Sequence, residues 1–488
     1  MDFSKIKKFF IRNRIPFILF IFAILIRIIF VYIYQIRIWD ETVYANLGYD
    51  LSLNPFHYAF DGKWSDYVPS SDLLYSWPNA GFRAPLLPYF LAIFYFFKID
   101  FLIDFLMPLI GALTVVLVYN LGKKLLGEKS AFYGALFLLF IPIHVLYSSR
   151  IMTDVFSSFF IILSIFSFWK GYELGNKKYK LLFGVFLAFA ILARYTSLFI
   201  LPLFLIYFLF RDKSCKFLKD KYIWFSVILF FVILFPWLLY GQMTYNNPLG
   251  AFIHGSMAST YWGGINPWYF FFQHSWQMFS ILSLAFVVSL VYVFYKKEFI
   301  RKEIFLLLVW IILIFGSAML FTHKEDRFVI SALPPLCLLT GFFIDKIRSY
   351  KFRNIVLVVI VLITLFSIFN LFSSSFNISH NINNQCYGLT MEYLNSLNYT
   401  YAILSENSAI AYYYTQKESA FYRFPLNEQM LSNLVNSTSS PPMIVYNQLN
   451  SGMSSEELEI FKKILKNGYK KEFECLLDSD HNFVYSFK

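Results

Sequence analysis

The sequence predicts a polytopic α-helical membrane protein of about eleven transmembrane helices, with a small extracytoplasmic α/β domain at its C-terminal end. Two features of the composition indicate this class: 58% of the 488 residues are hydrophobic, and only 15% are charged. Charged residues usually make up about 25% of a soluble chain, and so few charges could not keep this much apolar side chain in solution. The composition excludes soluble enzymes, small disulfide frameworks and disordered scaffolds.

Nine apolar segments are long enough to cross a bilayer, which takes roughly 20 helical residues. They are 16–36, 101–122, 130–147, 154–170, 222–240, 276–295, 303–320, 328–344 and 354–372. The segment 181–210 carries Arg194 and Pro202 near its middle, so we interpret it as a hairpin of two short spans. The segment Leu86–Phe97 is about 18 Å long as a helix, which is short for a crossing, and we interpret it as an interfacial helix.

The basic residues orient these helices, because cytoplasmic loops carry an excess of Lys and Arg. With the N-terminus inside, the inner segments hold 25 basic residues, and the outer loops and reentrant positions that connect the spans hold 8. This predicts a multi-pass protein of the cell membrane with a cytoplasmic N-terminus and an extracytoplasmic C-terminus. The net charge of +12 then serves mainly to set the orientation and to meet anionic lipids. Since the basic residues lie in short scattered loops, we expect no nucleic-acid partner.

The composition changes near residue 373, where Asn and Ser become frequent and apolar runs shorten. We therefore predict a transmembrane domain at 1–372, which includes a long first outer loop at 38–84, and an extracytoplasmic α/β domain at 373–488. The expected strands and helices of the second domain are 401–405, 419–424, 443–447 and 473–477, and 427–436 and 454–466. Cys386 and Cys475 both lie there, where a disulfide is chemically permitted, but the sequence leaves their pairing open. In the transmembrane domain, Trp268–Trp276 is expected to lie as an aromatic helix in the membrane interface.

Ionisable residues near the membrane core are costly, so each is a candidate functional residue. Several of them map to the predicted outer face, and their mixture of acids and bases suits an anionic substrate and a carboxylate that takes up a proton. The alternative for the basic residues, above all Lys324 and Arg327, is an anchoring role in which the side chain reaches the headgroups. The candidates are Asp40 and Glu41 after the first span, Arg83 before the interfacial helix, Arg150 and Asp154 at the start of a span, Arg194 at the hairpin tip, and Lys324 and Arg327 between two spans.

Other polar features carry less weight. Arg27 lies in the middle of the first span, and we predict a structural pair with Asp100 or Asp104. Asp478-Ser-Asp480 imitates the DxD motif of nucleotide-sugar enzymes, but an outer domain has no nucleotide supply. The histidines lack metal-ligand spacing, and the sequence contains no HExxH, P-loop or GxSxG motif. We therefore assign no metal ligands and no cofactor, although the acidic groups could hold a divalent ion.

Several short motifs follow one another in a recognisable order. Trp39-Asp40-Glu41 follows the first span, and Arg83-Ala-Pro85-Leu precedes the short helix, while 111–122, 149–154, 184–194 and 324–335 carry later motifs. Over about 40–345 this order resembles that of GT-C glycosyltransferases. More narrowly, it is similar to the branch with the dolichyl-phosphate-mannose protein mannosyltransferases and the lipid A aminoarabinose transferase. Arg194 stands where this branch usually has Lys, and Ala84 stands where it has Pro.

The resemblance implies a membrane glycosyltransferase that moves a monosaccharide from a polyprenyl (dolichyl or undecaprenyl) phosphate donor to a hydroxyl of a glycan, protein or lipid acceptor. It implies an inverting reaction, for which Asp40 is the candidate base, while Glu41 or Asp154 would orient it or bind hydroxyls. The donor phosphate gains charge as the sugar leaves and would be bound by cations. The candidates for this contact are Arg194 and Arg150, supported by Arg83, Lys324 and Arg327.

Two other interpretations stay open at this point. A polytopic transporter or flippase of a lipid-linked or anionic substrate would also place ionisable residues in membrane helices, although nearer the middle of the bilayer. A glycan polymerase or ligase of related architecture is the other alternative. The absence of a Trp-Trp-Asp motif disfavours transfer of a preassembled oligosaccharide.

Overall fold

The computed structural model describes residues 14–33, 37, 40–59, 80–261, 265–383, 386–397, 401–405, 408–417, 419–421, 442–447, 459, 462–463, 465–466, 469–477 and 480–487. The chain divides into two compact units, and each is described by itself. Unit 1 comprises Met1–Tyr32, Phe82–Leu87 and Phe101–Ser373. Unit 2 comprises Ile33–Gly81, Pro88–Asp100 and Ser374–Lys488.

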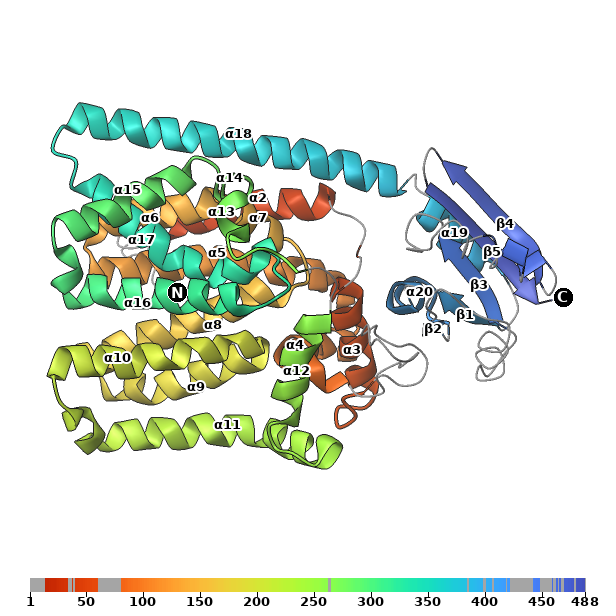
Figure 1. Cartoon of the computed structure of the whole chain (residues 1–488), viewed down its shortest axis with the longest axis horizontal. Coiled ribbons are helices and arrows are strands. Elements are labelled where there is room, and N and C mark those ends of the chain that lie inside the picture. Colours follow the sequence, from red (N-terminus) through yellow and green to blue (C-terminus); the bar gives the residue numbers. More distant parts are fainter. Residues whose placement is uncertain are drawn as a thin grey trace, which may run out of the picture. The chain divides into compact units, whose positions relative to one another are not determined.

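Unit 1 is a bundle of helices (Figure 1). Short helical turns connect several of them, namely η2 (Asp100–Leu102), η3 (Trp169–Glu173), η4 (Tyr195–Ile200), η5 (Cys215–Lys219), η6 (Glu298–Ile300) and η7 (Asp326–Ala332). The helices are α2 (Arg14–Ile33), α5 (Ile103–Leu125), α6 (Glu128–Phe140), α7 (Pro142–Tyr147), α8 (Thr153–Phe168), α9 (Lys177–Ala193), α10 (Leu201–Asp212), α11 (Lys221–Tyr245), α12 (Gly250–Tyr261), α13 (Phe270–Gln273), α14 (Ser275–Phe279), α15 (Leu282–Tyr295), α16 (Lys302–Leu320), α17 (Leu333–Asp345) and α18 (Tyr350–Asn383), the last of which continues beyond unit 1.

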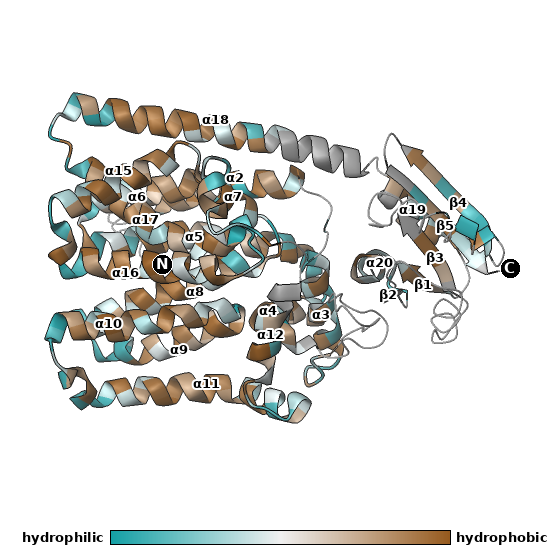
Figure 2. Ribbon diagram, in the orientation of Figure 1, coloured by the Kyte–Doolittle hydropathy of each residue, from teal (hydrophilic) through white to brown (hydrophobic). Residues whose placement is uncertain are grey.

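These helices confirm the predicted fold class of a polytopic helical membrane protein. Among the described residues, 8 helices are long and apolar enough to cross a membrane. Figure 2 shows that hydrophobic residues cover their middle parts, while hydrophilic residues gather towards several helix ends. Side chains of α11 and α18 such as Phe231 and Phe366 are exposed, as expected for helices that face lipid. The chain is an integral membrane protein.

Two of the predicted spans are interrupted at positions that the sequence marks. The predicted span 130–147 is two helices, because Ile141 adopts an extended conformation and Pro142 then starts α7. Proline favours the first turn of a helix, where its missing N–H costs nothing. The segment 181–210 also breaks, at Arg194 between α9 and η4, as the predicted hairpin requires. The predicted aromatic helix Trp268–Trp276 is divided between α13 and α14, with Trp268, Phe272 and Trp276 exposed.

Small residues allow the central helices to pack closely. A Cβ atom on Gly341 of α17 would lie 2.3 Å from the carbonyl oxygen of Ser130 on α6, and one on Gly134 would lie 2.9 Å from that of Cys337. On α9, a Cβ atom at Gly184 would lie 2.1 Å from the carbonyl oxygen of Ser226 on α11. Backbones approach this closely in membranes only where side chains are small, so these glycines determine the packing of the bundle.

The prediction for Arg27 was wrong. Its guanidinium is fully buried and donates from Nη1 to the carbonyl oxygen of Ala23 at 2.8 Å, while Nη2 lies 2.8 Å from Nδ1 of His144. His144 lies on α7, so the partner of Arg27 comes from the second half of the interrupted span 130–147 and not from Asp100 or Asp104. A histidine nitrogen can accept this hydrogen bond as a neutral group, which avoids the burial of a second charge.

Unit 2 contains a five-stranded mixed sheet in the order β2-β1-β3-β5-β4. The strand β1 pairs in parallel with β2 and β3, whereas β5 pairs antiparallel with β3 and β4. Four of the strands lie where the sequence predicts them, and β5 was not predicted. The helix α3 (Asp40–Leu53) lies wholly within unit 2, whereas η1 (Ala80–Phe82) and α4 (Leu86–Phe96) are shared between the two units. The other elements of unit 2 are α19 (Cys386–Ser396), β1 (Ala402–Ser405), α20 (Ser408–Thr415), β2 (Ser419–Phe421), β3 (Pro442–Asn447), β4 (Tyr469–Leu477) and β5 (Asp480–Phe487).

The sheet core and a disulfide hold this unit together. Leu394 of α19 packs with Ile403 of β1 and Val484 of β5 in one buried apolar cluster. Cys386 and Cys475 form a disulfide that ties α19 to β4, which answers the question that the sequence left open. The predicted helix 427–436, most of the predicted helix 454–466, Trp39, and 60–79 of the first outer loop lie outside the described residues, as does Asp478 of the DxD-like motif.

Candidate functional site

Arg194 lies where α9 ends. Its backbone is extended, with φ −159° and ψ 124°, and its N–H donates to the carbonyl oxygen of Ala190 at 3.1 Å. The chain then forms η4, and Pro202 lies in the first turn of α10. The break thus sets one cationic side chain between two apolar helical segments of unit 1.

The Arg194 guanidinium pairs with a buried carboxylate. Its Nη1 lies 2.7 Å from Oδ1 of Asp154, whose side chain is 1% exposed, whereas that of Arg194 is 20% exposed. Asp154 belongs to the first turn of α8, where the helix dipole favours a negative charge. Arg194 also donates to the hydroxyls of Thr153 at 3.3 Å and Thr196 at 3.1 Å. Two threonines therefore hold the guanidinium in place beside the carboxylate.

A second ion pair lies on the segment that leads into η7. Arg327 contacts both carboxylate oxygens of Glu325, at 2.8 Å from Nε and 2.9 Å from Nη2, which is the two-pronged geometry that guanidinium groups favour. The Nη1 atom of Arg327 lies 3.7 Å from the sulfur of Met152, directly before α8. The next residue, Phe328, places its ring 5.3 Å from the Arg194 guanidinium carbon. The two ion pairs are therefore neighbours.

Tyr147, at the end of α7, connects the same charges. Its phenol lies within electrostatic reach of Arg150, Asp154, Glu325 and Arg327. Together with Arg194 these four charged residues form one group, which we call the Arg194 cluster (Arg150, Asp154, Arg194, Glu325 and Arg327). The structure thus brings together four of the residues predicted for the site, Arg150, Asp154, Arg194 and Arg327, from three separate stretches of the sequence.

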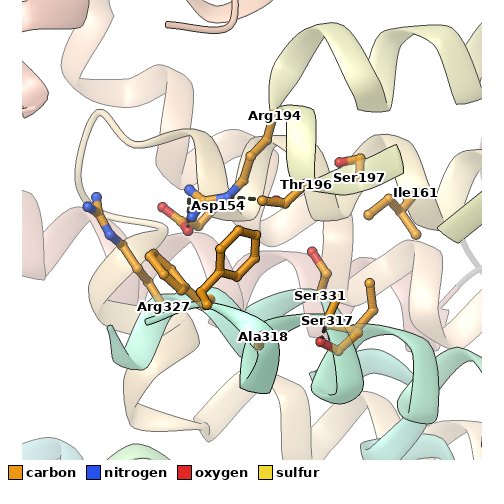
Figure 3. Close-up of a pocket in the computed structure, with 12 residues that line it drawn as sticks. Asp154, Ile161, Arg194, Thr196, Ser197, Ser317, Ala318, Arg327 and Ser331 are labelled. Atoms are coloured by element: carbon orange, nitrogen blue, oxygen red, sulfur yellow. Dashed lines mark hydrogen bonds and ion pairs between the residues drawn. The ribbon is translucent and has the colours of Figure 1, made fainter. Parts of the chain in front are cut away.

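A pocket opens beside the Asp154–Arg194 ion pair (Figure 3). Its lining combines charged groups, hydroxyls and apolar side chains from α8, η4, α16 and η7, as expected for a site that binds an amphipathic ligand. Ser317 and Ser331 lie on the wall of the pocket that faces Thr196 and Ser197 in this view. The lining residues are Asp154, Ile161, Arg194, Thr196, Ser197, Ile314, Ser317, Ala318, Phe321, Arg327, Phe328 and Ser331.

The Arg194 cluster contains three arginines and two carboxylates. Several guanidinium groups next to a partly apolar pocket favour an anionic group with an apolar extension, because guanidinium groups form strong charge-assisted hydrogen bonds with phosphates and carboxylates. Among the described residues, no group of three or more His, Cys, Asp or Glu side chains could hold a metal ion.

Lys324 donates to backbone carbonyls, and Arg83 is linked to the site through its own carbonyl oxygen. The ammonium of Lys324 is buried and donates to the carbonyl oxygens of Phe321 at 2.6 Å and Asn266 at 3.1 Å. The carbonyl oxygen of Arg83 accepts a hydrogen bond from the Tyr195 hydroxyl at 3.2 Å, one residue beyond Arg194. The Arg83 guanidinium carbon lies 5.2 Å from the ring of Phe82. Both residues thus contact segments that border the cluster or the pocket.

Asp40 and Glu41 belong to unit 2, where they form the first turn of α3. Glu41 is buried and Asp40 is half-buried. Almost the whole of α3 is buried, including the polar side chains of Asn46 and Asp50. Buried polar groups in a native structure are nearly always hydrogen-bonded, so this helix has specific partners.

Sequence reasoning missed the hydroxyl-bearing residues of the site. Thr153, Thr196, Ser197, Ser317 and Ser331 are isolated polar residues in apolar surroundings, and such hydroxyls usually bond to a carbonyl of their own helix. Ser317 does so, with its Oγ donating to the carbonyl oxygen of Ile314 at 2.9 Å. The only signal that could have identified the others is that Thr153 and Thr196 each lie within two residues of a charged candidate.

Comparisons with known proteins show which family and which folds this chain resembles. The sequence profile of the family described as Dolichyl-phosphate-mannose-protein mannosyltransferase matches residues 82–240, which contain Arg83, Arg150, Asp154 and Arg194. The fold is similar to that of ArnT from Cupriavidus metallidurans bound to undecaprenyl phosphate, with a TM-score of 0.74 at 12% identity over 96% of this chain and 97% of that one. The resemblance to GT-C glycosyltransferases is confirmed.

Two further matches extend the comparison. The archaeal oligosaccharyltransferase AglB from Archaeoglobus fulgidus, solved with an inhibitory peptide and a dolichol-phosphate, has a TM-score of 0.61 at 12% identity over 97% of this chain and 74% of that one. A protein of unassigned function from Aquifex aeolicus (strain VF5) is 25% identical over 326 residues, or 64% of each chain. The chain therefore matches less than two thirds of that relative's length. At these identities the matches to solved structures show that the chain has the GT-C fold.

Proposed function

We propose that this protein is a polyprenyl-phosphate-dependent glycosyltransferase that transfers a monosaccharide to an acceptor hydroxyl on the extracytoplasmic face of the membrane. The observation that carries the proposal is the pocket beside Asp154 and Arg194, which combines arginine side chains, hydroxyls and apolar side chains. The match of the mannosyltransferase profile to residues 82–240 supports it, as does the fold shared with a protein bound to undecaprenyl phosphate.

In this proposal the Arg194 cluster binds the phosphate of the lipid donor. When the bond between the anomeric carbon and the phosphate oxygen breaks, negative charge grows on the phosphate. Arginines held in fixed positions stabilise that charge without reorganisation, so they lower the barrier rather than only tightening binding. Arg194 is the principal contact, because Asp154, Thr153 and Thr196 fix its guanidinium while a fifth of its side chain stays exposed.

The acceptor hydroxyl has to lose a proton as it attacks the sugar. We assign this proton to the carboxylate of Asp40, with Glu41 orienting it or binding hydroxyls. A single displacement inverts the anomeric centre and needs one base, in contrast to the two carboxylates of retaining glycosidases. Neither the sugar nor the chemical class of the acceptor follows from these residues, so mannose is one candidate among several.

The proposal is tested with the full chain in nanodiscs, a polyprenyl-phosphate donor with a radiolabelled monosaccharide, and a membrane extract that supplies acceptors. We expect Asp40→Asn to lower transfer about 10²–10⁴-fold, which is the usual contribution of a general base. Asp100→Asn is the matched control, because Asp100 is an exposed aspartate of the same unit. Near-normal transfer by a folded Asp40→Asn variant would remove Asp40 from the role of base.

The same assay separates an enzyme from a flippase. A glycosyltransferase moves the label from the lipid phosphate to the acceptor, whereas a protein that only moves the lipid across the bilayer leaves the sugar on its phosphate. Label that stays on the donor in the wild-type protein, with its movement between leaflets accelerated, would overturn the proposed function.

A further inference from the structure

The helix α20 of the C-terminal region contacts α3, the helix that begins with Asp40 and Glu41, along its length. At one end the Tyr412 hydroxyl donates to Oδ1 of Asp50 at 3.4 Å. In the middle, Nδ2 of Asn46 donates to the carbonyl oxygen of Ala409 at 2.8 Å. Asn46 and Asp50 are 1% and 3% exposed, so these contacts satisfy polar groups that water does not reach. All of these residues belong to unit 2.

The most specific contact lies just before the acidic pair. The Tyr414 hydroxyl accepts a hydrogen bond from the backbone N–H of Arg37 at 2.9 Å and lies 3.2 Å from the Arg37 carbonyl oxygen. The Arg37 guanidinium donates from Nη1 to the Tyr413 hydroxyl, and its central carbon lies 5.4 Å from the ring of Tyr413. Two consecutive tyrosines thus hold both the backbone and the side chain of the residue three positions before Asp40. We call Arg37, Tyr413 and Tyr414 the tyrosine clasp.

The tyrosine clasp also interacts electrostatically with the acidic pair. The Tyr414 phenol interacts with the charges of Arg37 and Glu41, and burial raises the pKa of Tyr414 to about 12. The phenol therefore stays protonated at neutral pH and keeps its hydrogen bonds. The clasp has a rigid support, because Nδ2 of Asn395 on α19 donates to the Tyr414 carbonyl oxygen at 3.1 Å and α19 is tied to β4 by the disulfide.

We propose that the C-terminal α/β region positions the acidic pair, with the tyrosine clasp fixing the point at which α3 starts and hence the direction of the Asp40 and Glu41 carboxylates. The inference rests on the proposed function, in which Asp40 and Glu41 act on the acceptor. Asp40 is the first residue of α3, so its side chain direction changes if the preceding backbone moves. Misplacement of a catalytic group by about 1 Å can cost about 10²-fold in rate. Arg37, Tyr413 and Tyr414 are therefore positioning residues.

The test compares Tyr414→Phe with Tyr485→Phe in the full chain with its disulfide intact. Both changes remove one phenolic oxygen from unit 2, but Tyr485 lies on β5 and not on α20. Loss of one hydrogen bond corresponds to about tenfold. We expect Tyr414→Phe to lower kcat about tenfold with the KM for the donor and the melting temperature unchanged, and Tyr485→Phe to have no effect.

Hydrogen exchange gives a readout that does not depend on activity. We expect Tyr414→Phe to accelerate amide exchange about tenfold in peptides that cover 37–53, while peptides from α5 and α8 exchange as in the wild type. The double variant Arg37→Gln/Tyr413→Phe should accelerate this exchange no more than the more severe of the two single variants, because each substitution removes the same contact. Unchanged exchange at 37–53 would overturn the inference.

The kinetic outcomes separate this inference from the proposed function. If Asp40→Asn is inactive while Tyr414→Phe has normal kcat, the positioning inference fails and the catalytic assignment stands. If Asp40→Asn is active while Tyr414→Phe still accelerates amide exchange at 37–53, the proposed base is wrong and the clasp holds α3 for another reason. A fall in kcat of Tyr414→Phe that matches a loss of folded protein would also overturn the positioning role.

Discussion

The helical segment from α8 to η3 carries a charged cluster at each end, and the two clusters are built differently. Asp154 lies at its beginning and Glu173 at its end, 21 residues (Thr153–Glu173) or about 30 Å of helix. Glu173 accepts hydrogen bonds from Arg211 at 2.9 Å and from Lys302, and Arg211 also pairs with Asp212 at 2.5 Å. We call Glu173, Arg211, Asp212 and Lys302 the Glu173 cluster. It contains two acids and two bases, so its charges balance.

The surroundings of the two clusters distinguish a structural connection from a candidate binding site. In the Glu173 cluster one carboxylate that is 5% exposed joins α10 and α16 to η3, and each charge has a partner of opposite sign. In the Arg194 cluster a pocket with hydroxyls and apolar walls adjoins the ion pair. An ion pair that borders a pocket in a membrane bundle is therefore a candidate for function, whereas one that joins helices stabilises the bundle.

The largest effect that this comparison predicts is on catalysis at the Arg194 end. Arg194→Ala should lower transfer about 10²–10³-fold, the usual cost of removing one group that stabilises developing charge. Arg194→Lys should retain more activity, because a point charge still meets phosphate although the forked geometry is lost. Arg301→Ala is the control, since Arg301 is an exposed arginine that pairs with Glu298. Equal losses in the Ala and Lys variants, measured in the radiolabel assay, would count against contact with phosphate.

The next effect is on stability at the Glu173 end. Glu173→Gln removes the negative charge that joins two cations but keeps an acceptor oxygen, so we expect a cost of about 1.5–3 kcal/mol in the free energy of unfolding. Donor transfer by the folded fraction should stay at the wild-type rate. Thermal unfolding in detergent measures the first quantity and the radiolabel assay the second. A loss of transfer without a loss of stability would show that this cluster is also functional and would break the comparison.

The smallest effect concerns the ion pair of Lys180 and Asp220, which is close to the Glu173 cluster in sequence. Burial alone would raise the pKa of Asp220, but hydrogen bonds from Lys180 and from the N–H of Tyr222 lower it below its usual value. A lowered pKa adds stability above the unfolded pKa of about 3.9, and this stability is lost as the pH falls through the folded value. Asp220→Asn should thus cost less than about 1 kcal/mol at pH 7.

The Asp220→Asn substitution removes the charge of the side chain but keeps its capping hydrogen bond. Asparagine can still accept the hydrogen bond from Tyr222 that caps α11, so the variant isolates the charge. The melting temperatures of the two proteins should converge as the pH is lowered from about 4. A difference that stays constant between pH 7 and pH 3 would show that the carboxylate charge contributes nothing.

The sequence predicts the helices of this fold well, because crossing a bilayer requires long apolar segments that composition alone reveals. It also predicts the break at Arg194, where a charge and Pro202 interrupt an apolar run. The break at Ile141 was missed although Pro142 marks it, since the flanking residues keep the run apolar. The strand β5 was missed because Phe483, Val484 and Tyr485 form a short apolar run without the polar–apolar alternation that marks a half-buried strand.

Partners across the fold could not be predicted from local sequence. Asp154 and Arg194 were placed on one predicted face, but their ion pair depends on how α8 packs against α9. Arg27 was assigned to an acid nearby in the expected topology, whereas the structure pairs it with a histidine 117 residues away. The tyrosine clasp is equally non-local, because Arg37 and Tyr413 are 376 residues apart. The assignment of the two ends of the helices to the cytoplasmic and extracytoplasmic faces of the membrane stays a prediction.

The most direct test of the account is the position of a lipid phosphate in the full chain. The protein would be reconstituted in nanodiscs with dolichyl or undecaprenyl phosphate and its structure solved by electron cryo-microscopy. We predict density for a phosphate group within about 4 Å of the Arg194 guanidinium, the distance of an ion pair. Phosphate density bound elsewhere, with the Arg194 pocket filled only by water or by acyl chains, would contradict the account.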